Sequence, residues 1–243
     1  MIKKKLTQAP LQEVVFELRW ESQVENNNLY DEGYDLAMGV FHQKIKNQFP
    51  KHKKIYQDGI SVFGLPMQQY WKDEQKWPVI QHGPCVLVIN DIEENYDWES
   101  GFKPLILNCI SKLTESYSVT KKFNQLTLQY IDVFKSLDDI NIFVQNKLNI
   151  TLDTNIEGFD KSEQFSYYKN FTVSENSMLH LSISTANTSV IEQKYDALMI
   201  TINFVYSGIF DFNNIGEIID LAHDNTSLFF KKLLKTDFYG SLV

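Results

Sequence analysis

Apolar residues recur along the chain at two spacings, one typical of strands and one of helices, and the two types alternate in a regular order. Residues 12–21 have the β-branched and aromatic content of a strand, and residues 31–49 carry apolar side chains at helical spacing. Asp58-Gly59 has the residues of a tight turn, which predicts a hairpin over residues 53–64. We expect three further strands and a closing helix, over residues 68–72, 77–82, 85–91 and 98–117.

The second part of the chain repeats this order. Residues 178–184 alternate between apolar and polar side chains, as a half-buried strand does. A long final helix is indicated over residues 213–234, where apolar residues recur every three or four positions. The remaining expected elements are three strands and a short helix, over residues 123–134, 165–173, 197–209 and 138–148.

This order of elements predicts an α+β fold made of two β-α-β(n)-α halves, residues 1–119 and 120–243. No glycine-, serine- or proline-rich linker separates the halves, so we expect them to pack as one body. Two such units side by side would form a curved antiparallel sheet with helices on one face, as in TATA-binding-protein-like or helix-grip folds. A tandem pair of ferredoxin-like units is the alternative.

Charge narrows the possible partners. The chain has 31 acidic and 23 basic residues, a net charge of −8, and Arg19 is its single arginine. Binding to free nucleic acid requires several clustered cations, and the lysine clusters at residues 3–5 and 51–54 are short, so direct nucleic-acid binding is not expected. No apolar run reaches the roughly 18 residues of a membrane span. The lack of a signal-peptide pattern and the two isolated cysteines indicate a cytoplasmic protein.

Motifs for catalysis or metal binding are absent from the sequence. Cys85 and Cys109 lie in apolar segments, where burial raises a thiol pKa and makes the thiol inert. The five histidines are scattered without His-x-x-x-His spacing, and no Cys-x-x-Cys pair accompanies them. No glycine-rich phosphate loop or Gly-x-Ser-x-Gly motif is present either. We therefore predict no catalytic residue, no metal and no cofactor.

His223 and Asp224 are the closest approach to an acid–base pair. Adjacent side chains on a helix point about 100° apart, so the two are not expected to act on one water molecule. The simpler interpretation is that His223 anchors the last helix to the sheet. A buried acidic residue is also expected at Asp132, on the same strand face as Tyr130. Because Arg19 occupies the corresponding strand of the first half, we expect Arg19 or a lysine to pair with Asp132 as a structural ion pair.

Tyr70, Trp71 and Trp77 form an aromatic group in the strand region of the first half, together with Tyr56 and Phe63. On the open face of a sheet such residues anchor a protein partner or stack on a base, and the acidic balance of the chain favours a protein. Ordinary core packing is an equally good interpretation.

Five short motifs, in this order, resemble a sporadically distributed prokaryotic family of conserved hypothetical proteins. They are Pro10-Leu11-x-Glu13-Val14, Gln81-x-Gly83-Pro84, Tyr96-x-Trp98-x-x-x-Phe102, Leu128-Gln129-Tyr130-Ile131-Asp132 and Ala222-His223-Asp224. The chain departs from the family pattern at Gln129 and Asp132, where the family has arginine and asparagine, and at Asp224, where it has glutamate. The resemblance implies a shared fold and no particular chemistry. The scattered distribution of the family resembles that of defence and toxin-neutralising genes.

Two functional hypotheses follow. The first is a non-enzymatic cytoplasmic module that binds another protein, encoded by a neighbouring gene, as the accessory or neutralising subunit of an antiviral defence or toxin–antitoxin system. The second is an enzyme or a small-ligand or nucleotide sensor with a pocket beneath the sheet. That pocket would use Arg19, Asp132, His223 and Asp224.

Overall fold

A computed structural model describes residues 6, 9–25, 28–56, 62–74, 76–94, 96–135, 140–150, 166–190 and 193–243. The first half consists of β1 (Leu11–Trp20), β2 (Gln23–Glu25), β3 (Asn28–Tyr30), α1 (Tyr34–Ile45), β4 (Lys51–Lys54), β5 (Gln68–Trp71), β6 (Val79–Gly83), β7 (Val86–Asp91), the π-helical turn η1 (Trp98–Phe102) and α2 (Lys103–Thr114). The second half consists of β8 (Phe123–Phe134), α3 (Ile140–Lys147), β9 (Ser166–Ser174), β10 (Ser177–Val190), β11 (Gln193–Phe210), α4 (Ile215–Leu233) and α5 (Thr236–Leu242).

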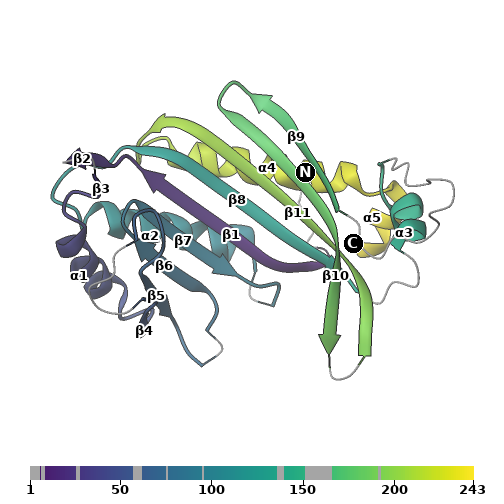
Figure 1. The fold of residues 1–243 in the computed structure, drawn as a ribbon, viewed down its shortest axis with the longest axis horizontal. Helices are drawn as coiled ribbons and strands as arrows, with labels where there is room; N and C mark the ends of the chain where they lie inside the picture. Colours follow the sequence, from purple (N-terminus) through teal and green to yellow (C-terminus); the bar gives the residue numbers. More distant parts are fainter. Residues whose placement is uncertain are drawn as a thin grey trace.

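The described strands form one nine-stranded sheet in the order β4-β5-β6-β7-β1-β8-β11-β10-β9, and β2 and β3 form a separate hairpin. Every neighbouring pair in the large sheet is antiparallel. The first strands of the two halves lie at the centre, where Val14 pairs with Tyr130 and Phe16 pairs with Leu128. Each half therefore extends outward from this central pair, the first toward β4 and the second toward β9 (Figure 1).

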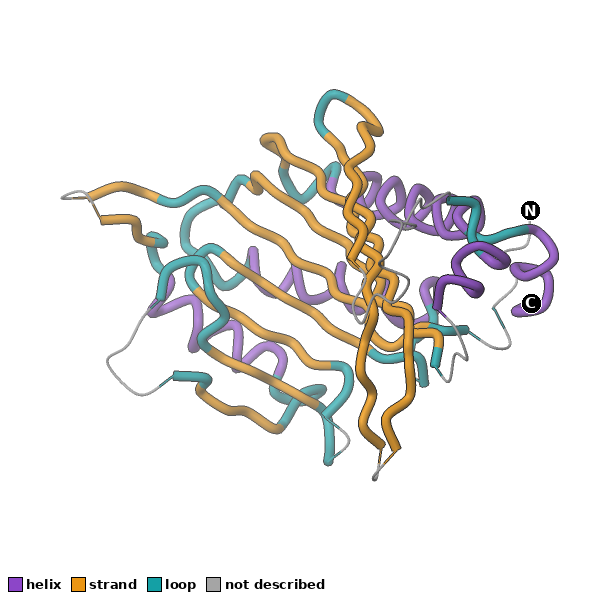
Figure 2. Tube along the Cα trace, turned by 45° about the vertical axis from the view of Figure 1, so that its right-hand side comes forward, coloured by secondary structure: helices purple, strands orange, loops and turns teal. Residues whose placement is uncertain are grey.

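Helices cover one face of this sheet. Figure 1 looks onto the other face and shows α2 and α4 behind the strands, and the turned view in Figure 2 shows the same layering. Strand residues that point to the helices are buried at every second position, as Phe16 and Leu18 are in β1. They join Ile106 of α2 and Ala222 of α4 in one hydrophobic cluster. The expected α+β class, with a large antiparallel sheet and helices on one face, is thereby confirmed.

Some local predictions were wrong or incomplete. Residues 51–54 form an edge strand that pairs with β5, in place of the expected hairpin over residues 53–64. The turn at Asp58-Gly59 lies outside the described residues. The helix expected over residues 98–117 begins as η1 and becomes α-helical only from Lys103, next to Pro104. The β2-β3 hairpin and α5 were not anticipated, because both are too short to show a clear periodicity.

Candidate functional site

The open face of the sheet, meaning the side turned away from α2 and α4, carries neutral side chains that form hydrogen bonds. In the central strands the residues between the buried apolar ones point to this side. The amides and hydroxyls of β8, β10 and β11 on this face include Gln125, Thr127, Gln129, Ser182, Thr201 and Asn203. From β6 to β9, the described charged residues on this face are Glu13, Glu17 and Arg19. Apolar side chains lie between these polar ones, among them Val15, Ile131 and Val205, so the face is of mixed polarity and nearly uncharged.

Arg19 lies on this open face, and its hydrogen bonds within the described part of the chain are to residues of the first half. Its Nε donates to Oε1 of Glu17 at 2.6 Å, and a second guanidinium nitrogen donates to the carbonyl oxygen of Gly64 at 3.1 Å. The expected ion pair with Asp132 is wrong for two reasons. Arg19 stands opposite Gln125 in the antiparallel register, near the other end of the strand from Asp132, and Asp132 points to the helices.

A loop closes one end of the open face. Gly64 N donates to the carbonyl of Pro84, and Met67 N donates to the carbonyl of His82, so residues 64–67 fold along the end of β6. A side chain at Gly83 would collide with the backbone carbonyl of Leu65, which explains why glycine is required there. The loop thus leaves β1, β8, β11 and β10 as the accessible centre of the face.

A chain of hydrogen bonds lies on the other side, between the sheet and the helices. The hydroxyl of Tyr130 in β8 lies 2.7 Å from that of Tyr96 and 2.8 Å from Nδ1 of His223 in α4. The His223 ring also stacks on Trp98 of η1, with ring centroids 4.0 Å apart. His223 therefore anchors the last long helix to both the sheet and η1, as predicted from the sequence.

Asp132 lies two residues beyond Tyr130 on the same face of β8 and is buried. Burial raises the pKa of its carboxyl group to about 7. Within the described part of the chain, no donor forms a hydrogen bond with this carboxyl group. Asp132 and His223 thus both lie near Tyr130, whereas Arg19 lies on the opposite face and Asp224 is exposed on α4. The structure brings together two of the four residues of the second hypothesis.

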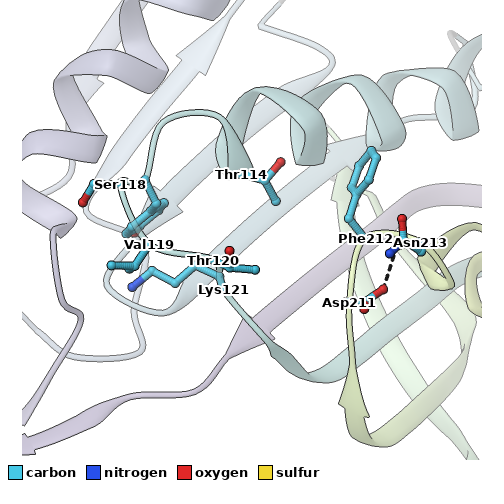
Figure 3. A pocket seen from close by; sticks show the side chains of 9 residues that line it. Thr114, Ser118, Val119, Thr120, Lys121, Asp211, Phe212 and Asn213 are labelled. Atoms are coloured by element: carbon cyan, nitrogen blue, oxygen red, sulfur yellow. Dashed lines mark hydrogen bonds between the residues drawn. The ribbon is translucent and has the colours of Figure 1, made fainter.

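Neither of two cavities on the described part of the chain reaches these buried residues. One, of about 260 Å³, lies beside Lys121 between the end of α2 and the start of α4, and its walls include Thr114 and Phe212 (Figure 3). The other, of about 280 Å³, lies between Trp77, Asp91 and the start of α2. Tyr130, Asp132 and His223 line neither cavity. These two cavities therefore give no access to the buried chain.

The aromatic group does not form one exposed patch. Tyr70 is fully buried on the helix side of β5 and stacks on His52, with ring centroids 5.0 Å apart, so the prediction that it binds a partner is wrong. Trp71 is half-buried at the end of β5, and alternation places it on the open face. Trp77 is half-buried and lines the second cavity.

A buried carboxylate at Asp31 was missed by the sequence analysis. Its Oδ2 accepts hydrogen bonds from Trp20 Nε1, the backbone N–H of Cys85 and the hydroxyl of Tyr117, and its Oδ1 lies 2.7 Å from the ammonium of Lys121. These groups come from three separate stretches of sequence, because Tyr117 and Lys121 both lie between α2 and β8. An aspartate just before a helix is typical of a helix start, so the local sequence contained no signal for these distant contacts.

Burial raises the thiol pKa of both Cys85 and Cys109 to about 12, as expected for inert cysteines. Among the residues that the structure describes, no group of three or more His, Cys, Asp or Glu side chains could hold a metal ion. None of the described helices is both long and apolar enough to cross a membrane. No family model, curated protein or solved structure matches this chain. The family resemblance therefore stays a prediction.

Proposed function

We propose that this chain is a non-enzymatic, cytoplasmic module that binds another protein through the open face of its sheet. The observation that carries the proposal is the low charge of that face. The chain has 31 acidic and 23 basic residues, yet from β6 to β9 the described open-face side chains include three charged ones, Glu13, Glu17 and Arg19. Protein interfaces are depleted of charge at their centre, whereas nucleic-acid surfaces concentrate cations.

The arrangement of hydrogen-bonding groups supports a protein partner of matching chemistry. Gln129, Thr201 and Asn203 are neighbours on β8 and β11, because Thr201 pairs with Ile131 and Asn203 pairs with Gln129. All three residues are half-buried, and the amide oxygen of Asn203 is itself buried without a hydrogen-bond partner among the described residues. We expect the partner to present an uncharged polar surface that satisfies these groups, since a charge placed against them would be desolvated without an opposite charge.

We extend the proposal to the fold and to the biological setting. The side-by-side central strands β1 and β8 favour a TATA-binding-protein-like or helix-grip arrangement over two separate ferredoxin-like units. The role as accessory or neutralising subunit of an antiviral defence or toxin–antitoxin system derives from the family resemblance. In that role the partner is the product of a neighbouring gene.

Co-expression with the product of an adjacent gene tests the proposal. We expect the two proteins to co-purify, and Thr201→Glu at the centre of the open face to weaken their affinity at least tenfold. Ser227→Glu is the matched control, because Ser227 is exposed on α4, on the helix side of the sheet. Equal affinity of both variants would contradict binding through the open face. If no adjacent gene product binds, the proposed protein-binding function is refuted.

A small-ligand sensor or enzyme is the second candidate, and the buried Asp132 favours it. A carboxyl group with a pKa near 7 can exchange a proton at neutral pH, and the hydroxyl of Tyr130 lies on the same strand face. Thermal-shift measurements with a panel of nucleotides and metabolites test this function. A ligand that stabilises the wild type but not Asp132→Asn would support it, and the absence of any stabilising ligand would count against it.

A further inference from the structure

The two edges of the large sheet differ in how they are protected. At one edge, β4 has four residues, Lys-His-Lys-Lys, all exposed. Short edge strands rich in lysine resist pairing with other chains. At the other edge, β9 has nine residues, and Lys169 is its single charged residue. β9 therefore lacks the charge protection that β4 has.

The backbone of β9 is regular and paired on one side. Residues Ser166 to Thr172 pair in unbroken register with Ser184 to Met178 of β10, and the register shift occurs only near Ser177. No strand of the described residues pairs with the other side, because β9 is the last strand in the sheet order. Figure 1 shows β9 as the outermost strand beside β10. A long, regular edge of this kind is a template for a further strand.

We propose that β9 pairs antiparallel with β9 of a second copy of this chain, about a two-fold axis at Asn170, so that the two sheets become one. In this register Asn170 faces itself, Tyr168 faces Thr172 of the second copy, and Lys169 faces Phe171 of the second copy. No charge stands directly opposite a like charge, which would oppose pairing. The two residues of each opposed pair both have even numbers or both have odd numbers. A residue on the open face of one copy therefore always meets a residue on the open face of the other copy.

Side chains next to this edge support the same partner. Tyr168 is 62% exposed, an unusual degree for a large aromatic residue in a sheet. On the helix side, Phe229 of α4 packs against Phe171, with ring centroids 5.0 Å apart, which identifies the flank of α4 nearest β9. At 100° per residue, Leu221 and Leu228 lie about 80° and about 100° from Phe229, on the side of α4 that turns away from its buried residues.

Both leucines are exposed, Leu221 by 39% and Leu228 by 51%. The two-fold axis would turn each of these flanks toward the same flank of the second copy. A C2 interface of this kind is self-complementary, with apolar residues meeting apolar residues beside the joined strands.

Sedimentation velocity of the full chain, across a range of protein concentrations, tests the proposal. We expect a reversible dimer in the wild type. Tyr168→Lys combined with Thr172→Lys places like charges opposite each other and should weaken the dimer at least tenfold. Tyr168→Lys combined with Thr172→Glu removes the same side chains but places opposite charges together, so this variant should stay dimeric. A wild type that stays monomeric, or a dimer that responds equally to both double variants, would overturn the proposal.

A cross-linking variant tests the register directly. Asn170→Cys would place two thiols opposite each other at the two-fold axis, and mild oxidation should give a disulfide-linked dimer. The native Cys85 and Cys109 are buried and do not compete. Ser182→Cys, on the neighbouring strand β10, is the control and should stay monomeric under the same oxidation. Equal cross-linking of both variants, or none at Asn170→Cys, would show that β9 does not pair with itself in this register.

Discussion

The ammonium group of Lys121 lies 2.7 Å from Oδ1 of Asp31, whose side chain is fully buried, and 9% of the Lys121 side chain is exposed. The other oxygen of Asp31 accepts hydrogen bonds from the side chains of Trp20 and Tyr117 and from the backbone of Cys85. One carboxylate thus joins β1, the turn before β7 and the connection between α2 and β8, which holds both Tyr117 and Lys121. Because this connection leads into the second half, Asp31 helps to hold the two halves in register.

We expect Asp31→Asn to lower the free energy of unfolding by about 3–5 kcal/mol, because it leaves the ammonium of Lys121 buried without its counterion. Urea denaturation at pH 7 measures this loss. The exposed pair of Lys44 and Glu115, at 2.8 Å, is the control, and Lys44→Met should cost less than about 1 kcal/mol. Similar losses in both variants would show that the pair of Asp31 and Lys121 contributes no more to stability than the exposed pair does.

Acid pH should destabilise the protein through His82. This side chain is fully buried, neither ring nitrogen has a hydrogen-bond partner in the described part of the chain, and burial lowers its pKa from 6.5 to about 4. Tyr34 and Phe41 of α1 and Trp20 of β1 surround the ring, with the Asp31 carboxylate near enough to offset part of the shift. The unfolded chain therefore binds a proton that the folded chain does not.

Stability from the neutral His82 is complete above pH 6.5 and falls as the pH drops from about 6.5 toward 4, by up to about 3 kcal/mol. Urea denaturation of the wild type and of His82→Phe at several pH values measures the difference. We expect the wild type to lose stability relative to the variant over this window. Parallel curves for the two proteins would refute the assignment.

The carboxyl group of Asp132 should make the stability of the protein depend on pH in the opposite direction. Burial raises the pKa of its carboxyl group from 3.8 to about 7, so the folded chain keeps a proton that the unfolded chain releases. Stability is therefore full below pH 3.8 and falls as the pH rises through about 7, at a cost of about 4 kcal/mol. We expect Asp132→Asn to stabilise the protein at pH 8 and to change little at pH 4. Thermal unfolding at both values tests this, and an equal effect at each would contradict it.

The sequence was sufficient for elements whose side chains alternate between core and surface. β8 was predicted at residues 123–134, the bounds that the structure has, because its apolar residues are buried at alternate positions. β4 could not be predicted, since all of its residues are exposed and it has no apolar pattern. The local Asp58-Gly59 signal instead suggested a hairpin that the described strand pairing does not contain.

Contacts across the sheet were predicted less well than the strands themselves. The pairing of Arg19 with Asp132 was inferred from matching positions in the two halves. Antiparallel pairing of β1 and β8 reverses this correspondence and places Arg19 opposite Gln125. His223 was correctly expected to anchor the last helix, but its partner Tyr130 lies 93 residues away and could be found only from the structure.

The bond between Tyr130 and His223 is open to a direct test. Tyr130→Phe removes a hydroxyl that contacts both His223 and Tyr96, and it leaves the polar atoms of both partners buried without it. We expect a loss of about 1–3 kcal/mol in the free energy of unfolding, measured with urea at pH 7. Tyr206→Phe on β11 is the matched control, because the Tyr206 hydroxyl has no hydrogen bond among the described residues, and it should cost less than about 0.5 kcal/mol. If the two variants were equally stable, the hydroxyl of Tyr130 would contribute nothing to holding α4 on the sheet, and His223 would have to act through other contacts, such as its stacking on Trp98.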